Sequence, residues 1–279
     1  MRYYFSIKIY EYSFLTIVIS AAGKLPKNNR ISWRGDSGLS DGINDTNFFK
    51  AGLVGGYYDA GDNTKFHFPM SFAMTMLSWS VIEYDQKYRS NGVRPHSGTH
   101  QMCTDYLLLT FNSSATKIDS IYSQVGGSQN GSRIPDDHTC WMRPEDMDYK
   151  RPVQIANAGS DLAGEMAATL AAASIVFRDN DAYSKKLIKG AETLFAFARD
   201  PGRRRRYSVG NSFIEPYYNS CGYYDEYMWG AAWLYYATDN NTYISIHLLI
   251  RSICGGITPP SRTRELGSSR TQALGFSWR

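Results

Sequence analysis

The 279-residue sequence contains little cysteine, and none of it is spaced like a metal or redox site. Its four cysteines are far apart along the chain: Cys103, Cys140, Cys221 and Cys254. Zinc sites and thioredoxin-like centres use closely spaced cysteine pairs, and small disulfide-bonded domains need far more cysteine per residue. The sequence therefore predicts no metal site and no disulfide framework, and we expect no cofactor.

The N-terminal segment lacks an apolar run long enough to span a membrane. Its hydrophobic stretch, Phe14–Ala22, is much shorter than the ~20 residues that a spanning helix needs. Arg2 and Lys8 precede this stretch, as in a signal peptide, but Glu11 interrupts the pattern. Residues 1–22 are predicted to be an atypical, weakly signal-like segment. A buried helical or β-like segment is the alternative.

Excess charge is absent from most of the chain. The formal net charge is +4, and the five arginines and one glutamate of residues 244–279 account for all of it. Residues 1–243 therefore sum to zero and predict no nucleic-acid surface. Much of the basic tail, 244–279, is rich in Gly, Ser, Thr, Arg and Pro without apolar periodicity, which predicts disorder.

Apolar residues recur at helical spacing, and no segment gives a convincing strand pattern. This predicts an all-α domain. Capping residues, Pro69 at one helix start and Asp200-Pro201-Gly202 at one helix end help to set the boundaries. The expected helices are 70–89, 99–111, 160–178, 184–199 and 225–238.

The most informative stretch is Gly55–Pro69, which places Asp59 and Asp62 three residues apart on a glycine-bounded loop before a helix. Aromatic residues surround the pair and supply flat faces for sugar rings. Carboxylates beside aromatic platforms suit the activation of water against a sugar. The structural alternative is that Asp59 caps a turn and Asp62 caps the following helix.

Four blocks in this sequence resemble glycoside hydrolase family 9, the plant endo-1,4-β-glucanases, in the family's order. They are YYDAGD at 57–62 with KFHFPM at 65–70, DHTCWMRPEDMDYKRP at 137–152, GSDLAGEMAATLAAAS at 159–174 and YDEYMWGAAWL at 224–234. The amino-acid sequences of segments 71–84 and 141–152 are most similar to those of the membrane-anchored KORRIGAN-type subgroup. The resemblance predicts a partial catalytic domain over residues 23–243.

The resemblance implies a fold and a reaction. The fold would be an (α/α)6 barrel, of which this chain supplies about half, and the substrate a β-1,4-glucan such as cellulose. Hydrolysis would proceed with inversion, with Asp62 as the base that deprotonates water and Asp59 as the residue that holds that water or orients Asp62. Sugar contacts are implied for Tyr58, His138, Trp141 and Trp229. A core position is the alternative for Trp229, and a salt-bridged loop around Arg143 and Arg151 is the alternative for the acidic residues of 137–152.

In the family the proton donor is a glutamate in a later segment that has no match in this sequence. We therefore expect little or no turnover, because proton donation contributes roughly 10²–10⁴-fold to rate. A non-catalytic remnant that binds glucan weakly is the alternative function. A generic helical interaction protein is disfavoured by the blocks at 57–62 and 141–148.

Compartment signals are modest. Four Asn-X-Ser/Thr triplets lie in polar, turn-like stretches, at Asn44, Asn112, Asn130 and Asn240. They favour a glycoprotein of the secretory pathway, at the cell wall or on a membrane. The subgroup resemblance implies a membrane anchor, which this sequence does not show.

Overall fold

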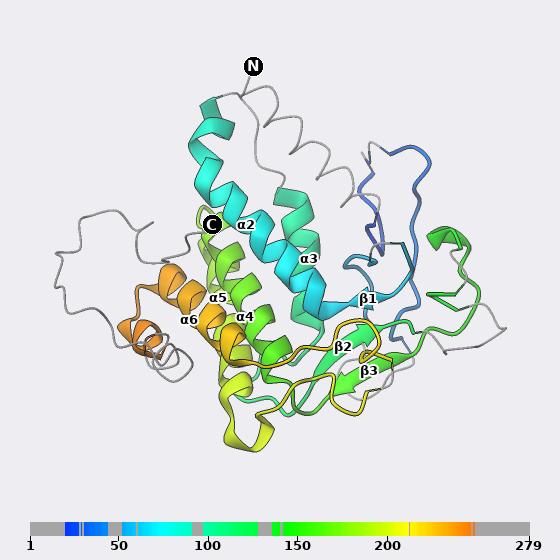
Figure 1. Cartoon of the computed structure of the whole chain (residues 1–279). Coiled ribbons are helices and arrows are strands. Elements are labelled where there is room, and N and C mark those ends of the chain that lie inside the picture. The colour runs from blue at the N-terminus through cyan, green and yellow to red at the C-terminus, as the bar shows by residue number, and fades with distance from the viewer. Residues whose placement is uncertain are drawn as a thin grey trace, which may run out of the picture.

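The computed structural model of the chain describes residues 20–27, 29, 31–43, 52–59, 61–90, 97–127, 136–139, 142–211, 213–246 and 248. They form a layer of helices with a small sheet at one end (Figure 1). The helices are α2 (His67–Ser90), α3 (Ser97–Leu109), α4 (Ser160–Val176), α5 (Asp181–Arg199) and α6 (Tyr224–Thr238). The mainly helical prediction is confirmed, and each expected helix is present with its ends shifted by at most three residues.

Helix α4 is the centre of the helical layer and packs against α2, α5 and α6. Every residue from Ser160 to Ser174 is buried. A helix that is covered on all sides must be apolar or small all round, which explains its run of alanines. Close contact with α6 is possible because Gly164 and Gly230 lie where the two backbones approach each other: a Cβ on Gly230 would lie 3.0 Å from the Gly164 carbonyl oxygen.

A three-stranded antiparallel sheet lies beside the first turn of α2, in the order β1 (Lys65–Phe66), β2 (Ile121–Val125), β3 (Val153–Ala156). The sequence predicted no strands, and this sheet corrects that detail of the prediction. Strand β2 reads IYSQV and is buried along its whole length, so no alternation of apolar and polar residues marks it. The loop that carries Asp59 and Asp62, between Asp59 and Thr64, is called the acid loop below and leads directly into β1. The sheet brings β1 alongside residues far away in the sequence.

The described residues between 20 and 43 run against the acid loop and form no helix. Isolated bridges pair Ala21 with Tyr57 and Gly23 with Ser37. Arg34 donates a 2.6 Å hydrogen bond to the Ala21 carbonyl and forms an ion pair with Glu145. No helix within the described ranges is both long and apolar enough to cross a membrane.

Candidate active site

The acid loop is a tight turn that ends directly before β1. The Asp59 amide donates to the Thr64 carbonyl at 2.7 Å, which closes the loop on itself. Gly61, at the exposed tip, has φ +82°, a left-handed conformation that glycine adopts without strain. Asp59 and Asp62 therefore lie on one short, closed turn.

Asp62 is the more buried carboxylate, with 7% of its surface exposed. One oxygen accepts a 2.8 Å hydrogen bond from the Thr64 amide, and the other lies 3.2 Å from His138 Nδ1. Burial raises the pKa of Asp62, and the nearby charge of Asp59 adds to the increase, whereas the bonds from Thr64 and His138 oppose it. Because α2 begins at His67, the alternative that Asp62 caps this helix is wrong.

Asp59 accepts a 2.7 Å hydrogen bond from the hydroxyl of Tyr218. Tyr218 precedes α6 by six positions, so this bond joins the acid loop to the segment that leads into that helix. Burial and the contact with Asp59 raise the pKa of Tyr218, which therefore stays a neutral hydroxyl donor. Nothing in the sequence spacing identified Tyr218, because its partner lies 159 positions away.

His138 is the solvent-accessible partner of Asp62. Its side chain is 44% exposed, whereas that of Asp62 is 6% exposed. The imidazole packs against Tyr217, with ring centroids 4.7 Å apart. Tyr217 and Tyr218 in turn contact Phe66 of β1, at 5.7 and 4.9 Å. The site thus combines a buried carboxylate, an accessible imidazole and a wall of aromatic rings.

The other predicted sugar contacts lie in different surroundings. Tyr58 is 5% exposed and its hydroxyl donates to Ser37 Oγ at 3.1 Å, so its side chain is largely packed among the loops, and it also lines the cavity that Asp59 lines. Trp229 donates through Nε1 to Glu165 at 3.1 Å, and its ring contacts Trp79 and Trp233. Trp141 lies outside the described residues. The substrate-binding role of each residue stays a prediction.

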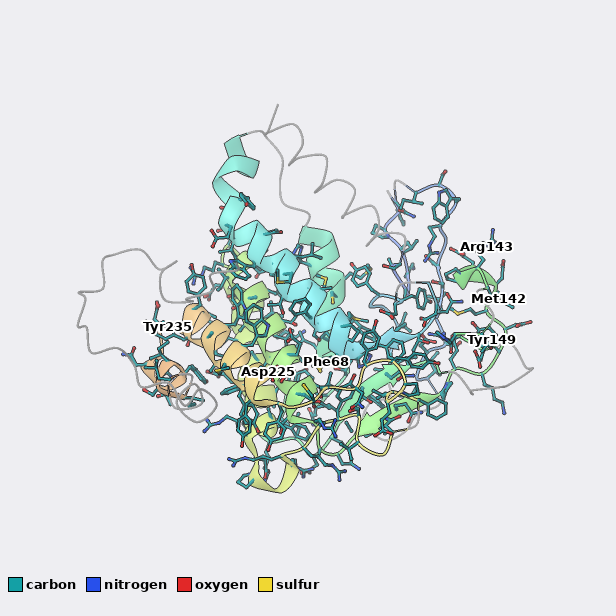
Figure 2. The ribbon with its side chains drawn as sticks, viewed as in Figure 1. Phe68, Met142, Arg143, Tyr149, Asp225 and Tyr235 are labelled. Atoms are coloured by element: carbon teal, nitrogen blue, oxygen red, sulfur yellow. The ribbon has the colours of Figure 1, made fainter. Side chains whose placement is uncertain are left out.

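The salt-bridged alternative for the loop at 137–152 holds for several of its acids. Exposed Arg143 pairs with Asp146 at 3.0 Å, and buried Arg151 pairs with Asp137 and, at 2.7 Å, with Asp41. Figure 2 shows Met142, Arg143 and Tyr149 on this loop, beyond the strands. Asp41 and Arg151 lie 110 positions apart, so the sequence could not pair them.

A cavity of about 230 Å³ lies between the acid loop and α2. Asp59 and Phe66 line it, together with an apolar face of α2 that comprises Met70, Ala73, Met74 and Leu77. Asp62 and His138 are not among the residues that line it. This pocket is therefore mainly apolar, and the polar side of the acid pair lies outside it.

Comparisons with known proteins identify the family of the chain. The family model described as Glycosyl hydrolase family 9 matches residues 8–249, which extends beyond the predicted 23–243 at both ends. The chain is 65% identical over 225 residues to Endoglucanase 12 of Oryza sativa subsp. japonica, and 54% identical over 251 residues to Endoglucanase 25 of Arabidopsis thaliana. These matches cover 80% and 88% of this chain but only 36% and 38% of the relatives.

Solved structures show the same similarity. An endoglucanase from the termite Nasutitermes takasagoensis aligns with a TM-score of 0.75 at 38% identity, over 85% of this chain and 52% of that one. Endoglucanase CelQ from Clostridium thermocellum, solved with cellobiose and cellotriose, aligns with a TM-score of 0.65 at 30% identity, over 85% of this chain and 35% of that one. The helical layer corresponds to about half of an (α/α)6 barrel of this kind, and the chain belongs to glycosyl hydrolase family 9.

Proposed function

We propose that this chain carries the water-activating half of an endo-1,4-β-glucanase site, which hydrolyses internal bonds of a β-1,4-glucan with inversion. Asp62 is the general base, and Asp59, oriented by Tyr218, holds the attacking water. The observation that carries the proposal is the pairing of buried Asp62 with half-exposed His138 on one side and of Asp59 with Tyr218 on the other.

The electrostatics of Asp62 suit a base. A carboxylate in water is a weak base, and burial makes it a stronger one by raising its pKa. Inversion needs a second carboxyl group, the acid, at roughly 6.5–9.5 Å from the base, with room for water. Asp59 lies on the same tight turn as Asp62 and shares the water, so it is not that acid.

Several glutamates within the described residues make their contacts away from Asp59 and Asp62. Glu145 pairs with Arg34, and Glu165 and Glu226 are buried at the contact between α4 and α6. This supports our prediction that the chain by itself turns over little glucan. Weak glucan binding without hydrolysis is the second candidate function, and half-exposed His138 with its aromatic neighbours supports it.

The proposed substrate follows from the relatives, which are named endoglucanases, and from CelQ, which was solved with cello-oligosaccharides. The KORRIGAN-type assignment and the secretory route are also proposals. The test is the electrophoretic mobility of the chain after expression in eukaryotic cells. An increase in mobility after treatment with an N-glycosidase would support the secretory route. Mobility that the N-glycosidase does not change would count against it.

The decisive experiment measures reducing-end release from soluble carboxymethyl-cellulose by the purified chain. The test variant is Asp62→Asn, and the matched control is Asp146→Asn, an exposed carboxylate on another loop. Turnover lost only in Asp62→Asn would support Asp62 as the base and overturn the prediction of low activity. No turnover in any variant, with cello-oligosaccharide binding that Asp62→Asn weakens, would support the binding alternative. Binding and turnover indifferent to Asp62 would refute both.

A further inference from the structure

We propose that Arg151 is the positioning residue of the acid loop: it fixes the backbone next to Asp62 and the segment that carries His138 through one buried guanidinium. The inference rests on the proposed role of Asp62 as the base, but its test below does not require turnover. Arg151 itself does not contact either carboxylate of the pair; it acts through Asn63 and Asp137.

Arg151 joins three segments that are distant in the sequence. Its Nε and Nη2 donate to the two carboxylate oxygens of Asp41 at 2.7 and 3.2 Å. Its Nη1 donates to the Asn63 carbonyl at 2.8 Å and forms an ion pair with Asp137. The side chain is only 7% exposed, so these bonds are shielded from water.

Asn63, directly after Asp62, is held at each of its polar backbone groups. Its carbonyl accepts from Arg151 at 2.8 Å, and its amide donates to the Asp137 carbonyl at 3.0 Å. Its side-chain amide donates to the Met142 carbonyl at 2.8 Å. These bonds restrict the movement of Asn63 and therefore also hold the backbone of Asp62, its neighbour in the chain.

Asp137 transmits the same constraint from the other side. Its carboxylate accepts from the Gly127 amide at 2.9 Å and pairs with Arg151, and the next residue, His138, faces Asp62 at 3.2 Å. The Arg151 guanidinium thus holds Asn63, which follows Asp62 in the chain, and Asp137, which precedes His138. An arginine suits this task because its planar fork offers five donors, whereas an ammonium group cannot bind a carboxylate through two parallel bonds.

The charges around Arg151 balance. Lys65 Nζ lies 2.7 Å from Asp41 and donates to the Leu53 carbonyl at 3.0 Å. Two cations and two carboxylates therefore share the buried cluster of Arg151, Lys65, Asp41 and Asp137. Although burial alone opposes ionisation, Lys65 and Arg151 lower the pKa of Asp41, which stays charged. The cluster is formally balanced near neutral pH, although burial raises the pKa of Asp137 to about 6 and lowers the pKa of Lys65 to about 8.

The test uses the full chain with ¹³C-labelled aspartate carboxyls, and the Asp62 signal is assigned with Asp62→Asn. In Arg151→Lys we expect the titration midpoint of Asp62 to rise by about one pH unit, because the bonds from Thr64 and His138 that oppose protonation are loosened. Arg143→Lys, an exposed arginine of the same loop, is the control and should leave the midpoint unchanged. If the chain also hydrolyses soluble glucan, Arg151→Lys should lower kcat more than it changes KM.

A second measurement remains decisive if Arg151→Lys does not fold. In the unmodified chain, the Asn63 amide should exchange with solvent about a hundredfold more slowly than that of exposed Gly61. Asp137→Asn keeps the backbone carbonyl that binds Asn63 but loses the charge that binds Arg151. Like Arg151→Lys, it should raise the titration midpoint of Asp62. A folded Arg151→Lys with an unchanged Asp62 midpoint, or fast exchange at Asn63, would overturn the proposal. Absence of turnover alone would agree with the low activity expected of this chain, and the proposal for Arg151 would still be decided by the Asp62 midpoint and the exchange rate at Asn63.

Discussion

The hydroxyl of Tyr218 donates a hydrogen bond of 2.7 Å to the carboxylate of Asp59, across 159 positions of sequence. The bond joins the turn before β1 to the segment before α6, at the end of the helical layer where Phe68 and Asp225 occupy the first turns of α2 and α6 (Figure 2). Since Asp62 accepts from Thr64 and faces His138, the two acids have different donors. Different donors allow the two carboxylates to have different roles.

Replacing Tyr218 by Phe removes the donor to Asp59 and keeps the ring that contacts Phe66. A hydrogen bond to a charged group contributes about 1.5–3 kcal/mol, so we expect glucan turnover or cello-oligosaccharide binding to fall by roughly 10- to 100-fold. Reducing-end assays and calorimetric binding measure the two quantities. Tyr235→Phe, a change on α6 far from the acid loop, is the matched control and should alter neither. Equal effects of the two changes would contradict the role of Tyr218.

The hydrogen bond between half-exposed His138 and Asp62 should affect the pH at which Asp62 ionises, and with it the low-pH limit of the reaction. This bond opposes the rise in the pKa of the Asp62 carboxyl, so His138→Ala should raise this pKa further. A base works only when ionised, and the low-pH limb of kcat/KM should therefore move to higher pH. The same shift is measurable without turnover, from the ¹³C-carboxyl titration of Asp62. His138→Asn, whose amide can donate from near the position of Nδ1, should restore part of the midpoint; a limb that does not move in His138→Ala would exclude this role.

The helices could be predicted from sequence because their information is local. The apolar spacing of α4, α5 and α6 lies within each helix, and these elements begin and end within three residues of their expected positions. The side-chain cap is present at α5, where Asn180 accepts from the Tyr183 amide, whereas Ser160 and Asp161 lie inside α4. The sheet could not be predicted in the same way. Strand β1 has two residues, and β2 is buried on both faces, so neither shows the alternation that identifies a strand.

The same distinction applies to the candidate site. Asp59, Asp62 and His138 lie in recognisable blocks, and the fold brings Asp62 and His138 together over 76 positions. Tyr218 and Asp41 lie in no such block. Tyr218 matters through one long-range hydrogen bond to Asp59, and Asp41 through its long-range bonds to Arg151 and Lys65. Tyr58 has a recognisable position but a buried ring, which only the packed structure could reveal.

Buried Glu165 should make the stability of the chain depend on pH. It is 5% exposed, accepts from Trp229 at 3.1 Å and from Thr75 at 3.4 Å, and burial raises its pKa to about 8, with the charge of Asp225 adding to the increase. The folded state therefore holds a proton that the unfolded state releases near pH 4.5. This contribution to stability is complete below that pH and is lost as the pH rises to about 8.

Glu165→Gln removes this titration with little change in shape. The free energy of unfolding of the unmodified chain, relative to that of Glu165→Gln, should fall between pH 4.5 and 8, by at most about 1.4 kcal/mol per pH unit, and then level off. Urea denaturation at a series of pH values measures the difference. Glu83→Gln is the control, because exposed Glu83 also accepts from a tryptophan, Trp79, at 3.2 Å. A pH dependence that is the same in both variants would disprove the assignment to Glu165.

The contact between α4 and α6 depends on the missing side chain of Gly164. A Cβ built there would lie 3.0 Å from both the Cβ and the carbonyl oxygen of Glu226, and the backbone oxygen cannot move aside easily. Gly164→Ala gains helix propensity but must push α6 away, so we expect a net loss of about 1–3 kcal/mol in the free energy of unfolding. Gly98→Ala in α3 gains the same propensity and meets no atom within 4 Å, so it should stabilise the chain by up to about 1 kcal/mol. Because both changes add one methyl group to a helical glycine, the difference between their urea midpoints isolates the helix contact, and equal midpoints would show that α4 and α6 can separate without cost.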